Sequence, residues 1–422
     1  MSFETISVIG LGYIGLPTAA MFASRKKKVI GIDVNQHTVD TINQGKIHIV
    51  EPDLDMIVGA AVSEGYLKAS TTPEPADAFL IAVPTPFLPC EEGEVPAPDL
   101  SYIEAASKAI APVLKKGDLV ILESTSPVGA TEQMAAWLAE ARADLTFPQT
   151  HGDNADVNVA HCPERVLPGH VVRELVENDR VIGGMSTRCS ERSVDLYKTF
   201  VKGECVVTNA RTAEMAKLTE NSSRDVQIAF ANELSIICDK LDINVWELIA
   251  LANRHPRVNI LQPGPGVGGH CIAVDPWFIV SKTPEEAQII HTARKVNDGK
   301  PEWVINKVKL AIADFLQANP DKTAKEVTVA CYGLAFKPDI DDLRESPAMA
   351  ITQQIVQVHA GRVIVVEPNI ESVPEKLKHA ELVTFDYAEK EADIQVLLVD
   401  HKEFKEELVR RGVIIDTKGI WK

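Results

Sequence analysis

The feature that most constrains the fold of this chain is a glycine-rich turn close to its N-terminus. Residues 10–15 read Gly-Leu-Gly-Tyr-Ile-Gly, directly after the apolar run Thr5–Ile9 and before a helical apolar pattern at Leu16–Ser24. A second apolar run, Lys28–Ile32, ends at Asp33. This order of strand, glycine turn, helix and strand predicts a parallel α/β sheet whose first turn binds a dinucleotide.

Each glycine of this turn has its own structural reason. Gly10 permits the tight turn, Gly12 lets the backbone approach a pyrophosphate, and Gly15 lets the following helix pack closely on the sheet. The carboxylate of Asp33 accepts hydrogen bonds from a ribose diol and repels a 2′-phosphate, so we predict NAD rather than NADP. The alternative is a glycine turn followed by a surface aspartate. The cofactor contacts predicted here are Gly10, Gly12, Tyr13, Ile14, Gly15 and Asp33.

The alternation of strands and helices stops in the middle of the chain. An apolar run at Leu119–Glu123 predicts a further parallel strand, whereas Thr212–Leu241 predicts one long amphipathic helix. Further helices are predicted at Val245–Asn253, Glu285–Asn297 and Glu302–Leu316, and Pro301 suits the first turn of the last one.

Strand patterns then return near the C-terminus. The later predicted strands are Val327–Tyr332, Val363–Glu367, Ile394–Val399 and Val413–Asp416. We therefore predict the fold class α/β, with two Rossmann-like parallel-sheet domains joined by a central helical domain that contains one long helix. The predicted domains are residues 1–208, 209–317 and 318–422.

Charge and composition narrow the class of partner. The chain has 422 residues and a formal charge of −17, which disfavours nucleic acid because such binding needs lysines and arginines to neutralise phosphates. No apolar run approaches the roughly 18 residues of a membrane span, and the N-terminus lacks the pattern of a signal peptide. Seven scattered cysteines without zinc-ligand spacing predict no metal site and a reducing compartment. We therefore expect a cytoplasmic protein with no nucleic-acid and no membrane partner.

A second glycine-rich stretch predicts a reactive site. Residues 263–271 read Pro-Gly-Pro-Gly-Val-Gly-Gly-His-Cys, and such a composition builds a loop that approaches a ligand closely rather than a core. Cys271 ends this loop, close to Asp275, and is a candidate thiolate nucleophile. The alternative for a lone cysteine is a buried and inert thiol.

The long predicted helix carries a polar face of Glu214, Lys217, Asn221 and Arg224, spaced three, four and three residues apart. If this face meets the Cys271 loop, Lys217 can exchange a proton with a reacting alcohol and Asn221 can donate to a developing oxyanion. The alternative is a solvated charged face.

These stretches and several others carry a family resemblance. The chain resembles the UDP-glucose/GDP-mannose dehydrogenase family over essentially its whole length, because the family's motifs occur in the family's order. The matching stretches are Val8–Pro17, Val83–Pro86, Glu123–Gly129, Cys162–Arg165, Glu214–Asn221, Gly268–Cys271 with Asp275, Gly333–Pro338 and Asp341–Pro347. The resemblance implies that residues 1–208 bind NAD, residues 209–317 serve dimerisation and catalysis, and residues 318–422 bind a UDP-sugar.

Within the family, Gly-Gly-Ser-Cys-Phe-Pro-Lys-Asp is typical of enzymes that oxidise UDP-glucose. Residues 268–275 read Gly-Gly-His-Cys-Ile-Ala-Val-Asp, which resembles the branch that acts on N-acetylated hexosamines, as does Arg254–Asn259. The resemblance implies oxidation of the C6 alcohol of UDP-N-acetyl-D-mannosamine to UDP-N-acetyl-D-mannosaminuronate, for a bacterial surface polysaccharide of the enterobacterial common antigen type. UDP-N-acetylglucosamine is the alternative substrate, since spacing does not reveal the epimer.

The resemblance also implies roles for individual residues. Cys271 would attack the C6 aldehyde left by a first hydride transfer, the thiohemiacetal would give a second hydride to NAD, and water would release the carboxylate. The implied catalytic residues are Cys271, Lys217, Asn221, Asp275 and Glu164. Further implied cofactor contacts are Thr85, Thr125, Arg344 and Lys418. The implied substrate contacts are Arg165, Val166, Lys217, Asn221, Arg224, His255, Arg257, Gly268, Phe336 and Lys337.

Family members form dimers around the long central helix, so the resemblance implies a homodimer in which Arg257 reaches the site of the neighbouring subunit. Two other functions stay open at this point. One is a dehydrogenase that stops after a single oxidation, with Cys271 merely structural, and the other is an NAD-sensing binding protein without turnover. The number of NADH molecules released per sugar separates the first from the family mechanism, and any turnover excludes the second.

Overall fold

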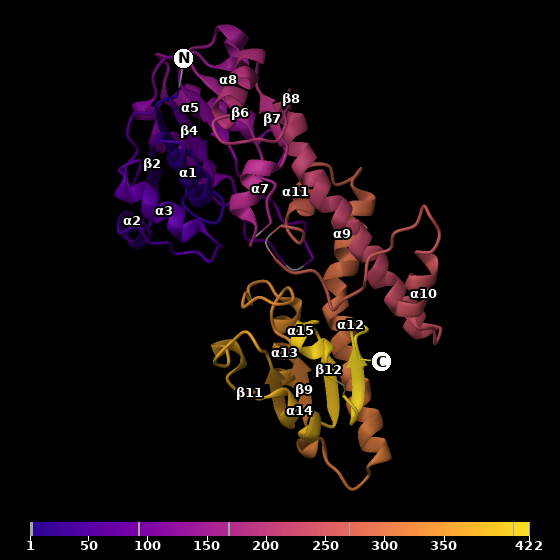
Figure 1. Ribbon diagram of the computed structural model, residues 1–422. Coiled ribbons are helices and arrows are strands. Elements are labelled where there is room, and N and C mark those ends of the chain that lie inside the picture. Colours follow the sequence, from indigo (N-terminus) through magenta and orange to yellow (C-terminus); the bar gives the residue numbers. More distant parts are fainter. Residues whose placement is uncertain (1–2, 92, 168, 270, 408, 422) are drawn as a thin grey trace. The chain divides into compact units, whose positions relative to one another are not determined.

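The computed structural model consists of two compact units, Met1–Glu220 and Asn221–Lys422, and each unit is described by itself. Figure 1 shows the helices and strands of both units. The boundary falls within the long helix α9 (Ala210–Lys240). The residues that the structure describes are 3–91, 93–167, 169–269, 271–407 and 409–421.

The first unit is built on a sheet in which the described strands follow the order β3-β2-β1-β4-β5-β6-β7-β8. Neighbouring strands pair in parallel, except that β6 and β7 pair antiparallel. The strands are β1 (Thr5–Ile9), β2 (Lys28–Ile32), β3 (Leu67–Ser70), β4 (Ala78–Ile81), β5 (Leu119–Leu122), β6 (Asn158–His161), β7 (Arg180–Gly184) and β8 (Cys205–Asn209). The helices are α1 (Gly15–Ser24), α2 (Gln36–Asn43), α3 (Leu54–Ser63), α4 (Ser101–Ile110), η1 (Ala111–Val113), α5 (Ala130–Ala141), α6 (Pro148–His151), η2 (Gly152–Asn154), α7 (Val171–Glu177) and α8 (Thr187–Tyr197).

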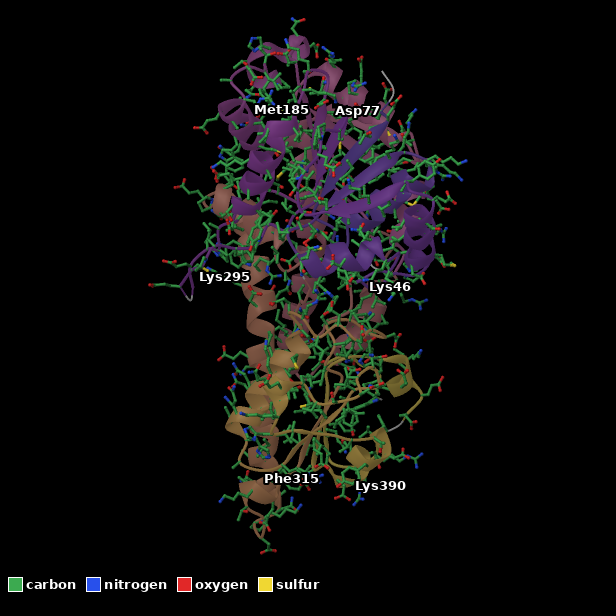
Figure 2. All side chains as sticks on the ribbon, turned by 90° about the vertical axis from the view of Figure 1, so that its left-hand side faces the viewer. Lys46, Asp77, Met185, Lys295, Phe315 and Lys390 are labelled. Atoms are coloured by element: carbon green, nitrogen blue, oxygen red, sulfur yellow. The ribbon has the colours of Figure 1, made fainter. Side chains whose placement is uncertain are left out.

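Both faces of this sheet are covered, as a parallel sheet requires. The central strands β4 and β5 read Ala-Phe-Leu-Ile and Leu-Val-Ile-Leu, and each of these residues is buried. One face packs against α1, α3, α7 and α8, and the other packs against α4 and α5. Asp77, labelled in Figure 2, holds the start of β1, because its carboxylate accepts hydrogen bonds from the N–H groups of Glu4 and Thr5. In this register the carboxyl ends of β1, β2 and β4 lie along one edge of the sheet.

The second unit contains a sheet of parallel strands in the order β11-β10-β9-β12-β13. Helices α12 and α13 pack on one face, and α14, α15 and Trp421 pack on the other. The strands are β9 (Val329–Tyr332), β10 (Val363–Val366), β11 (Glu381–Leu382), β12 (Ile394–Leu397) and β13 (Val413–Asp416). The helices are α10 (Val245–Ala252), α11 (Asp275–Lys282), α12 (Gln288–Ala318), η3 (Ala324–Glu326), α13 (Pro347–Val358), η4 (Glu375–Leu377), α14 (Phe385–Glu391) and α15 (Lys402–Lys405).

Helix α12 differs from the prediction, which placed separate helices before and after Pro301. The structure has one helix that runs through this residue. A proline in a helix interior removes one hydrogen bond and costs roughly 3 kcal/mol. Contacts on both sides of Pro301 offset that cost, because Arg294 bonds Asp225 at 2.6 Å, Lys307 bonds Asp239 at 2.7 Å, and the apolar residues that follow pack on the second sheet.

The predicted fold class is confirmed. Two sheets, the first parallel except for one strand pair and the second parallel throughout, are separated along the chain by a helical segment that contains α9 to α12. The sequence pattern does not indicate β8, because Cys205–Asn209 is a partly exposed edge strand that needs no continuous apolar run. Within the described ranges, no helix is both long enough and apolar enough to cross a membrane.

Candidate active site

The glycine turn after β1 leaves no room for a side chain at two of its three glycines. A Cβ on Gly10, whose φ is +90°, would lie 2.5 Å from the carbonyl oxygen of Ala82. A Cβ on Gly15 would lie 1.8 Å from the carbonyl oxygen of Gly10. Gly12 has nothing within 4 Å of its Cβ position. The turn is therefore tight and open at Gly12, as a backbone cradle for a pyrophosphate requires.

The carboxylate of Asp33 lies beside this turn. Its Oδ2 accepts a hydrogen bond of 2.9 Å from the N–H of Leu11, and its Oδ1 accepts one of 2.9 Å from the N–H of Asn35. Among the described residues, the buried Oγ1 of Thr85 has no hydrogen-bond partner. This arrangement fits NAD. The partly exposed carboxylate of Asp33 is suited to a ribose, the glycine turn forms a backbone cradle, and the hydroxyl of Thr85 is left to bind a ligand. The other cofactor contacts predicted in this unit, all at least partly exposed, are Tyr13, Ile14 and Thr125.

Glu214 joins helix α9 to the turn after β5. Its buried carboxylate accepts hydrogen bonds from the N–H groups of Gly129 at 2.7 Å and Thr131 at 2.8 Å, at the N-terminus of α5. This cap links the turn that contains Thr125 to the half-buried Lys217, one helical turn after Glu214. Sequence reasoning placed Glu214 only on a charged face, because spacing along one helix gives no sign of a distant helix N-terminus.

Glu164, shortly after β6, belongs to a buried cluster of charged side chains. Its Oε2 accepts hydrogen bonds from both terminal nitrogens of Arg180, at 2.5 and 2.9 Å. The same guanidinium lies 3.8 Å from Glu123, whose Oε1 accepts a hydrogen bond of 2.6 Å from the hydroxyl of Tyr197. Burial raises the pKa of Glu123 to about 7, against the opposing effect of Arg180. No sequence spacing links these residues, since it is the pairing of strands that gathers them.

Two predicted substrate contacts follow Glu164 directly. Arg165 forms an ion pair with Glu220 at 2.6 Å, and Val166 packs against the core of the first unit. A small cavity in this region is lined by Pro163, Glu164, Arg165, Glu174, Leu175, Asn178, Asp179 and Arg180. The segment therefore places two guanidinium groups and several carboxylates around one hollow.

The second unit brings three of the predicted catalytic residues together. The Nδ2 of Asn221 donates a hydrogen bond of 2.5 Å to Oδ2 of Asp275, which is buried at the start of α11. The N–H of Asp275 donates to the carbonyl oxygen of Cys271 at 2.9 Å, and Cys271 is exposed. Lys217 lies one turn before Asn221 on α9 and belongs to the first unit. An exposed thiol one turn before a helix N-terminus is suited to nucleophilic attack.

The glycine loop that leads to Cys271 packs against the segment before α13. A Cβ on Gly268 would lie 2.6 Å from the carbonyl oxygen of Glu345 and 3.0 Å from Cβ of Phe336. At the start of the loop, the N–H of Gly264 donates to Oδ1 of Asn232 at 2.9 Å. Asn232 is buried and also bonds Asn297, so α9 and α12 hold the loop through a polar contact that sequence reasoning missed.

The remaining predicted contacts lie on exposed segments of the second unit. His255 and Arg257 follow α10, with the Arg257 N–H donating to Nδ1 of His255 at 3.3 Å. Arg344 pairs with Asp342 at 2.7 Å. The Nζ of Lys418 lies 3.6 Å from the Cβ position of Gly264, so it is beside the glycine loop. The predicted cofactor set is thus divided between the two units, and Arg224 and Lys337 are both exposed.

Three models of one family match almost the whole chain. The NAD binding domain of the UDP-glucose/GDP-mannose dehydrogenase family matches residues 4–201, its central domain matches 211–299 and its UDP binding domain matches 330–422. The chain belongs to the UDP-glucose/GDP-mannose dehydrogenase family. As a member of this family it is an NAD-dependent oxidoreductase, so the predicted cofactor, NAD, is confirmed.

Relatives of this family member resemble it over their full length. It is 68% identical over 428 residues to a UDP-N-acetyl-D-mannosamine dehydrogenase of Yersinia pestis, with 100% of both chains covered. It is 64% identical to an NDP-N-acetyl-D-galactosaminuronic acid dehydrogenase of Ralstonia nicotianae, over 100% of this chain and 97% of the relative. A solved UDP-N-acetyl-mannosamine dehydrogenase of Staphylococcus aureus is 42% identical, with 99% of this chain and 96% of that chain covered and a TM-score of 0.84.

Proposed function

We propose that this dehydrogenase oxidises the C6 alcohol of UDP-N-acetyl-D-mannosamine to the carboxylate of UDP-N-acetyl-D-mannosaminuronate, with two molecules of NAD. The full-length similarity to the Yersinia pestis enzyme is the observation that carries the choice of substrate. The contacts among Asn221, Asp275 and Cys271 support the chemistry. The product would supply a bacterial surface polysaccharide of the enterobacterial common antigen type.

The first oxidation needs a base and a group that orients the alcohol. NAD, when bound, accepts the hydride in each of the two oxidations. Lys217 takes the proton of the C6 hydroxyl, and an aldehyde remains once the hydride has left. Asn221 donates a hydrogen bond to the C6 oxygen, and Asp275 sets the direction of that donor by holding the amide at 2.5 Å.

Cys271 makes the second oxidation possible. Its thiolate forms a C–S bond to the aldehyde carbon while the oxygen takes a proton, and the resulting thiohemiacetal carbon again carries a hydride that can leave. Loss of that hydride and of the hydroxyl proton gives a thioester. Water then adds to the thioester carbon, the C–S bond breaks, and the thiolate and the carboxylate separate while the two protons of the water are released to solvent. We assign the orientation of this water to Asp275, with Glu164 assisting.

A second candidate substrate class follows from the Ralstonia relative, which is named for an N-acetyl-D-galactosaminuronic acid. The corresponding C6 alcohol, a UDP-N-acetyl-D-galactosamine, differs from the proposed substrate in the configuration of the sugar ring, and the chemistry at C6 is unchanged. UDP-N-acetylglucosamine, the alternative drawn from the motifs, belongs in the same comparison. Relative kcat/KM values over these three UDP-sugars decide among them.

We also propose a cytoplasmic homodimer formed through the central helix. The part of α9 that belongs to the second unit leaves the large apolar side chains of Phe230 and Ile237 exposed, and the exposed Leu241 follows directly after the helix. Phe230 and Ile237 are seven residues apart, so they share one face of α9. The three-part division at residues 1–208, 209–317 and 318–422 is proposed with it, supported by family models that match 4–201, 211–299 and 330–422.

The stoichiometry of NADH tests the proposed function. Purified protein is supplied with NAD and each UDP-sugar, and the NADH and uronate formed per sugar are measured. We expect two NADH per UDP-N-acetyl-D-mannosamine, and a fall of at least about a thousandfold in uronate formation for Cys271→Ala, because the nucleophile is lost.

Cys90→Ala is the matched control, since Cys90 is also an exposed thiol but lies outside the proposed site. This variant is expected to keep the stoichiometry of the unaltered protein. One NADH per sugar would replace the proposal with a single-step dehydrogenase. A normal uronate yield from Cys271→Ala would exclude the covalent mechanism.

A further inference from the structure

The two sheets of this protein begin with the same backbone turn. Gly10 follows β1 with a φ of +90°, and Gly333 follows β9 with a φ of +88°. The strands around them have the same order, β3-β2-β1-β4-β5 in the first sheet and β11-β10-β9-β12-β13 in the second. Positions in the two turns can therefore be compared one with the other.

An acidic residue follows the neighbouring strand in both sheets. In the first sheet, Leu11 donates its N–H to Asp33 at 2.9 Å, and in the second sheet Leu334 donates its N–H to Glu367 at 2.7 Å. Glu367 thus takes the place of the acid that binds a ribose in a dinucleotide fold. Asp33 is partly exposed, whereas Glu367 is only 4% exposed.

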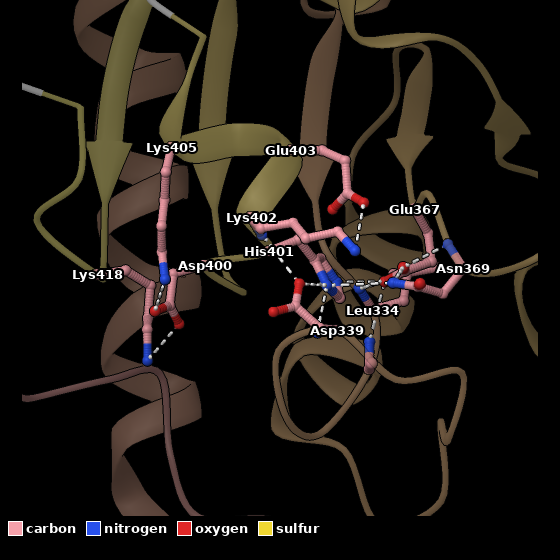
Figure 3. Close-up of polar contacts among 11 residues, drawn as sticks. Leu334, Asp339, Glu367, Asn369, Asp400, His401, Lys402, Glu403, Lys405 and Lys418 are labelled. Carbon is pink, nitrogen blue, oxygen red and sulfur yellow. Dashed lines mark hydrogen bonds and ion pairs between the residues drawn. The ribbon is translucent and has the colours of Figure 1, made fainter.

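His401 and Asn369 form hydrogen bonds with the carboxylate of Glu367, as Figure 3 shows. The Oε2 of Glu367 accepts a hydrogen bond of 3.0 Å from Nε2 of His401, and its Oε1 accepts bonds of 3.1 Å from the N–H and Nδ2 of Asn369. Burial acts to raise the pKa of Glu367, but these bonds outweigh it and the pKa is lowered. Because Glu367 is buried and both of its carboxylate oxygens accept hydrogen bonds from the protein, Glu367 holds protein rather than ribose.

The ring of His401 joins two segments with its two nitrogens. Its Nδ1 accepts hydrogen bonds from the N–H of Asp339 at 3.0 Å and from Nδ2 of Asn369 at 3.2 Å, so the ring proton belongs on Nε2, which faces Glu367. The carboxylate of Asp339 accepts the N–H of Lys402 at 2.9 Å, which ties the same point back to the residue after His401. The histidine is fully buried.

A metal ion is a poorer account of this cluster. Ligand-type atoms of Asp339, His401 and Glu403 lie within 4.8 Å of one another, the one such group in the described part of the chain. The lone pair of His401 Nδ1 already receives two N–H groups, and Nε2 donates to Glu367. Neither nitrogen is left to bind a cation.

The segment held in this way carries predicted substrate contacts. Residues 334–346, here called the 334–346 loop, contain Phe336 and Lys337, and Glu367 and His401 bond its backbone at Leu334 and Asp339. The other side of the loop packs on the glycine loop, where the Cβ position of Gly269 lies 3.3 Å from the ring of Phe336. The loop thus lies between the buried His401 and the segment that leads to Cys271.

We propose that His401 is a positioning residue for the UDP-sugar: together with Glu367 it holds the 334–346 loop in the conformation that binds the nucleotide. This inference rests on the proposed function, because Phe336 and Lys337 are substrate contacts only if a UDP-sugar is the substrate. The inference does not depend on the glycine turn at residues 10–15, which lies in the other unit.

Three substitutions separate the hydrogen bonds at the two nitrogens of the His401 ring. His401→Asn keeps an acceptor for the N–H of Asp339, His401→Gln keeps a donor for Glu367, and His401→Ala removes both. We expect His401→Ala to raise the KM for the UDP-sugar and the Kd for UDP by about tenfold, and the two amide variants to raise them less. The KM for NAD is expected to rise less than the KM for the UDP-sugar, because Arg344 is the one predicted cofactor contact in the 334–346 loop.

His359→Ala is the matched control, because His359 bonds Val327 at 2.8 Å in the same unit but touches neither Glu367 nor the 334–346 loop in the described contacts. It is expected to leave both substrate constants unchanged. If His401→Ala fails to fold, the two amide variants decide. Unchanged UDP binding in the His401 variants, or an equal rise in the KM for NAD, would overturn the inference. A lack of turnover by the unaltered protein would instead refute the proposed function, while UDP binding would still test His401.

Discussion

At the residue scale, the buried charges around Arg180 are the feature with the clearest consequence. One guanidinium contacts Glu164 through two hydrogen bonds and lies 3.8 Å from Glu123. Two carboxylates and one cation leave a net negative charge in the interior, which is costly unless one carboxyl takes up a proton. The pKa of Glu123, raised by burial to about 7, identifies it as that group, while Glu164 keeps the closer contact with Arg180.

Glu123→Gln is expected to change how stability depends on pH. A carboxyl whose pKa rises from 4.5 to about 7 on folding contributes stability that is present below pH 4.5 and is lost as the pH rises to about 7. Glutamine does not titrate, so the stability of the variant relative to the unaltered protein should rise over this window by up to roughly 3 kcal/mol. Urea unfolding at about pH 5 and about pH 8 measures it. Tyr197→Phe keeps the carboxyl and removes a hydrogen bond that lowers its pKa, so stability should still fall as the pH rises over this window. If the stability of Glu123→Gln changed with pH as much as that of the unaltered protein, the assignment would be contradicted.

At the element scale, α5 depends on a residue that is distant in the sequence. The first N–H groups of a helix have no acceptor within that helix. At the start of α5, Glu214 on α9 accepts hydrogen bonds from two of them, those of Gly129 and Thr131. Glu214 therefore connects the start of α5, and the turn before it that contains Thr125, to the helix that carries Lys217. A substitution of Glu214 should therefore lower the free energy of unfolding and also alter the conformation of the turn that contains Thr125.

Glu214→Ala is expected to lower the free energy of unfolding by about 2 kcal/mol, because it leaves buried N–H groups without an acceptor. Glu132→Ala, on α5 itself, removes an exposed ion pair with Arg211 and should cost less than about 1 kcal/mol. Denaturant unfolding of both variants compares them directly. Equal losses would show that the cap does not stabilise α5.

At the scale of the whole molecule, helices α9 and α10 expose large apolar side chains whose exposure to water needs an explanation. Phe230 is 51% exposed and Ile237 is 45% exposed on one face of α9, and Leu251 of α10 is 60% exposed. A large apolar face on a helix is stable in water when a partner covers it. A second copy of the chain is the proposed partner.

Phe230→Glu is expected to convert the proposed dimer into monomers, because a charge would have to be buried at the centre of the apolar face. Light scattering coupled to size-exclusion chromatography gives the mass directly. Val358→Glu changes another exposed apolar residue, outside α9 and α10, and should leave the mass unchanged. A monomeric unaltered protein would remove the dimer proposal.

Much of the fold follows from patterns among neighbouring residues. The first turn is predicted by Gly10, Gly15 and Asp33. Only glycine tolerates the close contacts at Gly10 and Gly15 and the positive φ of Gly10. Pro301 is misleading, since a local rule that ends helices is outweighed by packing on the second sheet and contacts with α9. Local patterns report what a segment prefers, and they are silent about what it packs against.

The sequence by itself determined the two sheets, the cofactor turn and the glycine-rich loop before Cys271, because glycine geometry, apolar runs and helix periodicity are properties of residues close together in the chain. Only the tertiary structure decided that Arg180 joins Glu123 to Glu164, that Glu214 caps α5, and that His401 closes the acid of the second sheet. Each of these contacts joins groups brought close by strand order or helix packing. Charge and hydrogen bonding act through space, so their partners become known when the chain is folded.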